Sequence, residues 1–172
     1  MQDLALSILG FILIFGQVVQ TEPYDFKRVV NKTCVPQPEM QIAEVRLGDH
    51  SDSIRIKSGE PKNKDTQDGR EVYIYPGLEI QLHAARVRSV SCHAPLCTTP
   101  SGIRPGETVE RVSQILGFDV ETIEPPHRKA LNQYFIHRCI RSDELIDVEQ
   151  YFSFEVDDNN VLTSIAIFWV AP

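Results

Sequence analysis

Apolar residues recur at helical spacing in one segment of the chain. Thr108 can cap the start of a helix there and Gly117 can end it. Together these features predict an amphipathic helix over residues 109–116. A shorter helix is predicted where Asp49 or Ser51 can act as the cap, Ile54 points inward and Gly59 closes the turn. The apolar positions of the helix over residues 109–116 are Val109, Val112, Ile115 and Leu116.

Several other segments alternate apolar and polar residues, which is typical of strands with one buried face. Three short strands are predicted over 71–75, 78–82 and 86–91, the first two joined by a Pro-Gly turn. The polar stretch 62–70 before them is interpreted as a loop. Longer strands are predicted over 133–140, 148–156 and 161–170, with the Asp-Asp-Asn-Asn sequence 157–160 turning the last two into a hairpin.

The chain also contains one motif twice. Residues 45–49, Val-Arg-Leu-Gly-Asp, return 58 positions later at 103–107 as Ile-Arg-Pro-Gly-Glu, and each copy precedes a predicted helix and strands. A repeated unit of this kind predicts similar modules packed together. The expected fold is therefore α+β in two similar modules, residues 42–100 and 101–172, each a short helix packed on an antiparallel sheet. Because each half is small for an independent core, the halves are expected to share an interface or a sheet.

The second copy, from Ile103 through Thr108 to the Leu116-Gly117 pair, resembles the unit of the small lipoproteins of outer-membrane assembly. Its duplication is similar to the secreted β-lactamase inhibitor protein, in which two helix-plus-sheet modules form a concave binding surface. The chain differs from the lipoproteins because no cysteine closely follows its apolar N-terminal run. The resemblance implies a non-enzymatic binding module outside the cytosol.

The first twenty residues differ from the rest of the chain. The run from Leu4 to Phe15 is almost continuously apolar, and no Lys or Arg occurs before Lys27. This length favours a secretion signal over a membrane span, with a mature protein beginning near Thr21, although Asp3 is unusual in a signal. An uncleaved anchor and a structural element are the alternatives. Residues 21–41 are interpreted as a leader to the first module, and the expected location is periplasmic or secreted.

The chain contains four cysteines, an even number that suits an oxidising compartment. Three pairings are possible. We favour Cys92 with Cys97, because this pair closes a short loop that Pro95 already bends, and therefore Cys34 with Cys139. The alternative is a zinc site built from Cys92, His93, Cys97 and a distant Cys or His, although the spacing of the first three fits zinc loosely.

The net charge of the chain indicates which class of macromolecule it is expected to bind. The chain has a net charge of −7, which disfavours nucleic acid and anionic membranes and favours a basic protein. No two of its five histidines have the spacing of metal ligands, and no cofactor or metal is expected. The Cys92-His93 pair points to opposite faces of a strand, so a Cys/His-dependent enzyme is the less favoured alternative.

The C-terminal strands are acidic and aromatic. A solvated strand face explains this composition, and so does a recognition surface that combines carboxylates with aromatic anchors. The sequence-based hypothesis is an inhibitor, immunity or accessory protein of the cell envelope, with an assembly or scaffold component as the alternative. Its predicted binding residues are Glu149, Tyr151, Glu155 and Asp157, with Tyr73 and Tyr75 beside the 92–97 loop as a second candidate region.

Overall fold

The structure is a computed structural model that describes residues 33–67, 69–122, 132–139 and 149–170. The predicted signal, most of the leader and the acidic residues Asp143, Glu144 and Asp147 lie outside the described residues. No helix in the described ranges is long and apolar enough to span a membrane.

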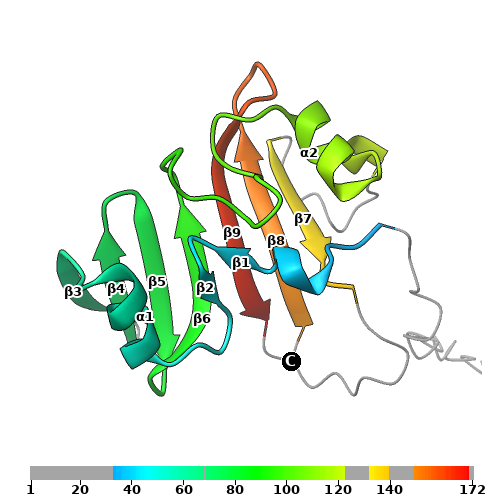
Figure 1. The fold of residues 1–172 in the computed structure, drawn as a ribbon. Helices are drawn as coiled ribbons and strands as arrows, with labels where there is room; N and C mark the ends of the chain where they lie inside the picture. Colours follow the sequence, from blue (N-terminus) through cyan, green and yellow to red (C-terminus); the bar gives the residue numbers. More distant parts are fainter. Residues whose placement is uncertain (1–32, 68, 123–131, 140–148, 171–172) are drawn as a thin grey trace, which may run out of the picture.

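One antiparallel seven-stranded sheet dominates the molecule, with strand order β3-β4-β5-β6-β9-β8-β7 (Figure 1). The strands from the two halves of the sequence meet in its centre, where β6 pairs with β9 and Val90 lies opposite Ile167. The strands are β3 (Asn63–Gln67), β4 (Arg70–Tyr75), β5 (Leu78–His83), β6 (Arg86–Cys92), β7 (Gln133–His137), β8 (Glu149–Val156) and β9 (Leu162–Val170).

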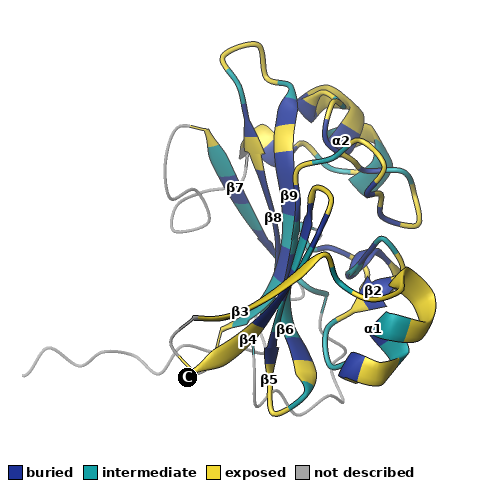
Figure 2. Ribbon diagram, turned by 90° about the vertical axis from the view of Figure 1, so that its left-hand side faces the viewer, coloured by how far each residue is buried: buried dark blue, intermediate teal, exposed yellow. Residues whose placement is uncertain are grey.

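Two helices and a small hairpin lie on the same side of this sheet (Figure 2). Helix α2 has the predicted bounds and caps: Thr108 Oγ1 accepts a hydrogen bond from the Arg111 N–H at 3.2 Å, and Gly117 adopts a left-handed conformation. Helix α1 is capped by His50, whose Nδ1 accepts from the Asp52 N–H, rather than by the expected Asp49 or Ser51. The remaining elements are α1 (Ser51–Ser58), α2 (Val109–Leu116), β1 (Gln41–Ile42), β2 (Val45–Arg46), η2 (Gln37–Glu39) and η3 (Val120–Thr122).

The predicted fold class is wrong. The described chain forms one mostly β domain around a continuous sheet and a single apolar core, not two modules that each pack a helix on its own sheet. The physical reason is that the β6–β9 ladder leaves no sheet edge between the halves. A second correction concerns the polar stretch 62–70, which is not a loop: Asn63–Gln67 forms the edge strand β3, whose charged side chains suit an exposed edge.

Alternation along the strands separates two faces. The face beneath the helices is apolar across the whole sheet. One row of directly opposed residues runs from β4 to β7, and every member is buried: Tyr73, Ile80, Val90, Ile167, Phe152 and Ile136.

Two disulfides lie next to strands of this sheet, one just beyond the end of β7 and one at the end of β6. Cys34 is bonded to Cys139 and Cys92 to Cys97, which is the pairing favoured from the sequence. Beside the first bond, Val35 pairs with the end of β7, donating its N–H to His137 and accepting from the Cys139 N–H, both at 2.8 Å. Zinc cannot bind Cys92 and Cys97 as thiolates while they form a disulfide.

A buried carboxylate connects η2 to the loop that precedes α2. Glu39 is only 6% exposed, and its oxygens accept hydrogen bonds from Thr99 Oγ1 and Ser101 Oγ at 2.6 Å and from the Ser101 N–H at 3.3 Å. Because three donors satisfy the carboxylate, this contact fixes the loop without a counter-ion.

The two disulfides should differ in their contribution to stability because they close loops of very different length. The Cys34–Cys139 bond spans 105 residues and the Cys92–Cys97 bond spans 5. Loop-closure entropy predicts that Cys34→Ser with Cys139→Ser lowers the free energy of unfolding by about 4–5 kcal/mol, against about 2 kcal/mol for Cys92→Ser with Cys97→Ser. Urea denaturation of the two double variants measures this difference. Equal losses would show that chain entropy does not govern these bonds.

Candidate functional site

The sheet face turned away from the helices is the candidate site, and we call it the open face. No described helix covers it (Figure 2). A row of directly opposed residues crosses it from edge to edge. In strand order from β3 to β7 the row is Asp65, Val72, Gln81, Ser89, Phe168, Tyr151 and His137.

Aromatic rings gather at the β7–β8–β9 end of the open face. Tyr151 stacks on Phe168 with ring centroids 5.6 Å apart and an interplanar angle of 11°, and on its other side His137 lies 4.3 Å away. Phe135 meets Phe168 edge-on at 6.1 Å. All four side chains are half-buried. The four rings, here called the aromatic cluster, form a preorganised apolar surface that remains partly accessible.

Carboxylates surround the aromatic cluster. The Tyr151 hydroxyl donates to Glu149 at 2.5 Å, which holds this phenol and carboxylate together. Glu155 accepts from Gln133 Nε2 at 3.1 Å and from Ser164 Oγ at 3.2 Å, and it stays exposed. The structure therefore places three of the predicted binding residues, Glu149, Tyr151 and Glu155, on one face.

Asp157 belongs to the β8–β9 turn instead of the open face. Its Oδ1 accepts from the backbone N–H groups of Asn159 at 2.8 Å and Val161 at 3.0 Å. The backbone hydrogen bond from Val161, followed by that from Asn159, lowers the pKa of Asp157 below its ordinary value. These contacts give Asp157 a role in shaping the hairpin.

The two tyrosines of the second candidate region are buried. Tyr73 and Tyr75 lie on the helix-covered face and are only 5% and 9% exposed. The Tyr75 hydroxyl donates to the Gly59 carbonyl at 3.0 Å, and burial raises the pKa of this phenol. Both rings are core residues, because their strand has its apolar face turned to α1.

Sequence reasoning missed Phe135 and His137 as members of the aromatic cluster. The signal was available in part, since both alternate with buried Tyr134 and Ile136 along β7. What the sequence did not supply was the register that sets His137 opposite Tyr151.

The thiol and the metal-ligand candidates considered from the sequence can be located among the described residues. The sulfur of Cys92 is bonded to Cys97 and is fully buried, so it is no nucleophile in this state. Within the described ranges no three His, Cys, Asp or Glu side chains are grouped as metal ligands would be.

Comparison with known proteins finds similarity in structure but not in sequence. No family model and no curated protein matches its sequence. A cysteine-rich secretory protein from Staphylococcus aureus is similar in structure, with a TM-score of 0.50, 15% identity and coverage of 78% of this chain and 48% of that one. An extracellular protein containing an SCP domain from Bacillus anthracis matches at a TM-score of 0.41 and 14% identity, over 71% of this chain and 43% of that one. The chain thus spans about half the length of these proteins.

The observed fold corrects the resemblance drawn from the repeated motif. The chain forms one continuous sheet and is similar in fold to the Staphylococcus aureus protein, and it is not built from tandem copies of the outer-membrane lipoprotein unit. The motif was misleading because a glycine turn before a capped helix describes only local backbone geometry and does not specify how the strands pair. Gly48 and Gly106 each donate an N–H to the sheet, to Val87 and Leu162 respectively, within one domain.

The lowered pKa of Asp157 predicts a pH-dependent contribution to stability. A carboxylate whose folded pKa lies below its unfolded value of about 3.9 stabilises the protein above that pH, and the effect is lost as the pH falls through the folded pKa. Asp157→Ala should therefore be less stable than wild type at about pH 7, with the difference shrinking below about pH 4. Urea denaturation across this range measures it, and Asp158→Ala, at the exposed neighbour, is the control. A difference that does not change with pH would contradict this role.

Proposed function

We propose that this chain is a non-enzymatic, disulfide-bonded binding module outside the cytosol, and that it recognises a basic protein through the open face of its sheet. The observation that carries the proposal is the aromatic cluster, which is packed against itself yet half-exposed beside carboxylates. Aromatic side chains held rigidly at a surface are the residues that most often anchor protein interfaces.

The charge of the open face supports a basic partner. Glu149 and Glu155 lie beside the aromatic cluster on β8. Asp65, Glu79 and Arg70 lie farther along this side, on β3, β5 and β4. The whole chain is also acidic, at −7. Acidic groups around an apolar centre raise the association rate of a cationic protein and disfavour anionic partners.

The two disulfides support a location outside the cytosol, because such bonds persist in oxidising compartments. The two structural neighbours are named as secretory and extracellular proteins, which agrees with this location. An inhibitor or accessory role fits a module of this kind. The assembly or scaffold role depended on the corrected resemblance and has no separate support, and the buried disulfide at Cys92 disfavours the Cys/His enzyme.

The partner must first be identified. A photo-crosslinking amino acid at Gln133 on the open face, with Glu110 on α2 as the control position, captures it from an envelope or secreted extract.

The first test replaces the central ring of the aromatic cluster. With the purified partner, Tyr151→Ala should weaken binding by about 1–3 kcal/mol, and Tyr151→Phe should retain most of the affinity because the ring remains. Calorimetric titration measures the affinities. Unchanged binding by folded Tyr151→Ala would overturn the proposal.

The second test reverses one charge on the open face. Glu155→Lys should slow association with the purified partner by about threefold or more at low salt and reduce its salt dependence. Glu110→Lys makes the same change of charge on the helix side and should have a smaller effect. Stopped-flow kinetics at two salt concentrations separates them. Equal effects of the two substitutions would show that only net charge matters, which contradicts a site on the open face.

A further inference from the structure

The loop between Cys92 and Cys97 projects from the end of β6 on the other side of the molecule from the aromatic cluster. Besides the disulfide, three contacts fix its shape. His93 donates its N–H to the Gly77 carbonyl at 2.9 Å, and Cys97 donates its N–H to Ala94 at 3.0 Å. Gly77 is so close that a side chain there would place its Cβ 2.3 Å from the Ala94 methyl. The loop is therefore held rigidly against the β4–β5 turn.

This rigid loop exposes an apolar side chain. Leu96 is 93% exposed, and Pro95 beside it is also exposed. Leu96 gives almost nothing to the core, so folding does not explain an apolar residue here. A side chain presented on a preorganised loop loses little entropy when a partner covers it, which makes Leu96 suited to binding.

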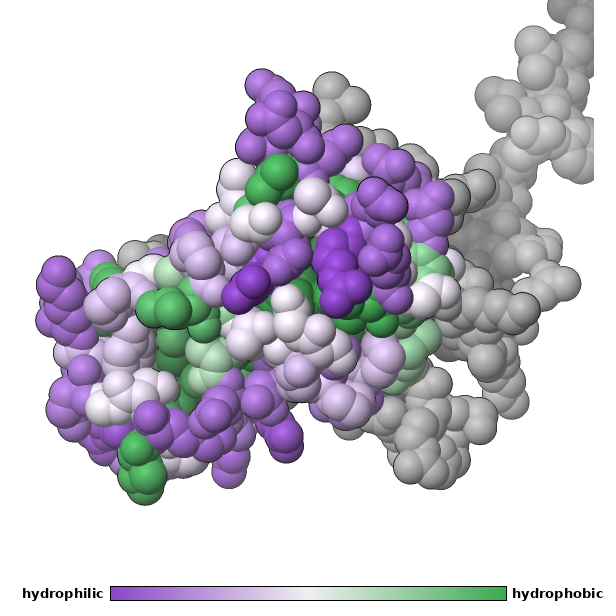
Figure 3. All heavy atoms as spheres, turned by 45° about the horizontal axis from the view of Figure 1, so that its top comes forward, coloured by the Kyte–Doolittle hydropathy of each residue, from purple (hydrophilic) through white to green (hydrophobic). Residues whose placement is uncertain are grey.

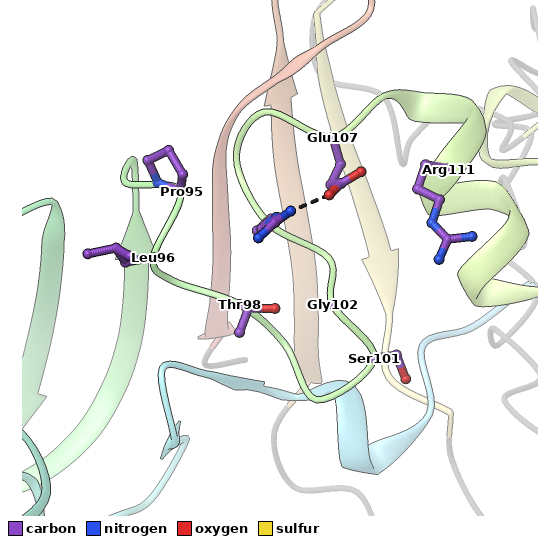
Figure 4. A pocket seen from close by; sticks show the side chains of 8 residues that line it. Pro95, Leu96, Thr98, Ser101, Gly102, Glu107 and Arg111 are labelled. Carbon is purple, nitrogen blue, oxygen red and sulfur yellow. Dashed lines mark hydrogen bonds and ion pairs between the residues drawn. The ribbon is translucent and has the colours of Figure 1, made fainter.

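A groove of about 440 Å³ extends from Leu96 to the first turn of α2 (Figure 4). Strongly hydrophilic and hydrophobic side chains lie next to each other on this side of the molecule (Figure 3). Thr98, Ser101 and Gly102 form the middle of the groove, between the Leu96 end and the arginine end.

Two guanidinium groups give the far end of the groove a positive charge. The Nε of Arg104 donates a hydrogen bond to Glu107 at 3.0 Å, and one terminal nitrogen of Arg111 donates a hydrogen bond to Gln114 at 3.3 Å. Among the described residues, their other N–H donors have no partner in the structure. The side chains that line the groove include two arginines and one carboxylate, Glu107, while the Glu39 carboxylate lies buried behind Ser101. The accessible lining is therefore locally basic on an acidic chain.

We propose that this groove binds an extended acidic segment of a partner protein, with an apolar side chain on Leu96 and Pro95 and carboxylates on Arg104 and Arg111. Charge complementarity selects this occupant, since guanidinium groups with free donors bind carboxylates in charge-assisted hydrogen bonds. The groove and the open face lie on different sides of the sheet and carry opposite charge. The groove is therefore a second site, whose test does not depend on the proposed function.

The test is a titration of the disulfide-intact protein, followed by NMR, with three capped tetrapeptides. The sequences are glycine-leucine-glutamate-glutamate, the same peptide with glutamine for both glutamates, and the same peptide with serine for leucine. The first should bind saturably and shift the amide signals of Leu96, Gly102 and Arg111. The glutamine peptide should bind about tenfold more weakly, and the serine peptide about threefold more weakly. Raising the salt from about 0.05 M to about 0.5 M should weaken the first peptide most.

Variants of the groove locate the interaction. Arg111→Gln should weaken the glutamate peptide about fivefold or more, and Leu96→Ser about threefold, without loss of folding because both side chains are exposed. The controls are Arg70→Gln and Ile56→Ser, an exposed arginine and an 85% exposed apolar residue elsewhere, and both should bind as wild type does.

Three results would overturn the proposal. One is tighter binding of the glutamine peptide than of the glutamate peptide. Another is a loss of binding in the control variants equal to that in the groove variants. The third is a set of shifts at Leu96 and Arg111 that depends on protein concentration without peptide, because this would identify a second copy of the chain as the occupant.

Discussion

The β6–β9 ladder is the interaction on which the rest of the structure depends. It pairs Val90 with Ile167 and Cys92 with Ile165, and so joins strands from the two halves of the sequence. Without it, each half would expose a long sheet edge and bury only part of its apolar surface. With it, one row of apolar side chains continues across the molecule, and the domain has a single core.

Continuity of the sheet also creates the open face. Because alternate residues point to opposite sides, the same registers that align the buried row align Ser89 with Phe168 and Phe168 with Tyr151. The helices and the small hairpin cover only one side. A continuous sheet surface with aromatic and acidic side chains is the consequence, and it is the surface that we propose binds a protein partner.

The two disulfides stabilise different parts of the structure, one the whole domain and the other a single loop. The Cys34–Cys139 bond ties the N-terminal side of the described chain to the end of β7, where Val35 already pairs with His137 and Cys139. The Cys92–Cys97 bond acts locally and holds a loop that carries Leu96 away from the core. The first stabilises the domain mainly by constraining the unfolded chain. The second mainly gives a surface loop one shape.

The sequence by itself determined the local features. Thr108 and Gly117 bounded α2, alternation located most of the strands, and Pro95 between close cysteines indicated the short disulfide. Only the tertiary structure decided which strands meet. The repeated glycine motif suggested separate modules because local turn chemistry contains no information about the β6–β9 register. The tertiary structure also decided that Tyr73 is core whereas Tyr151 is surface, since alternation separates two faces but only packing against the helices determines which face is buried.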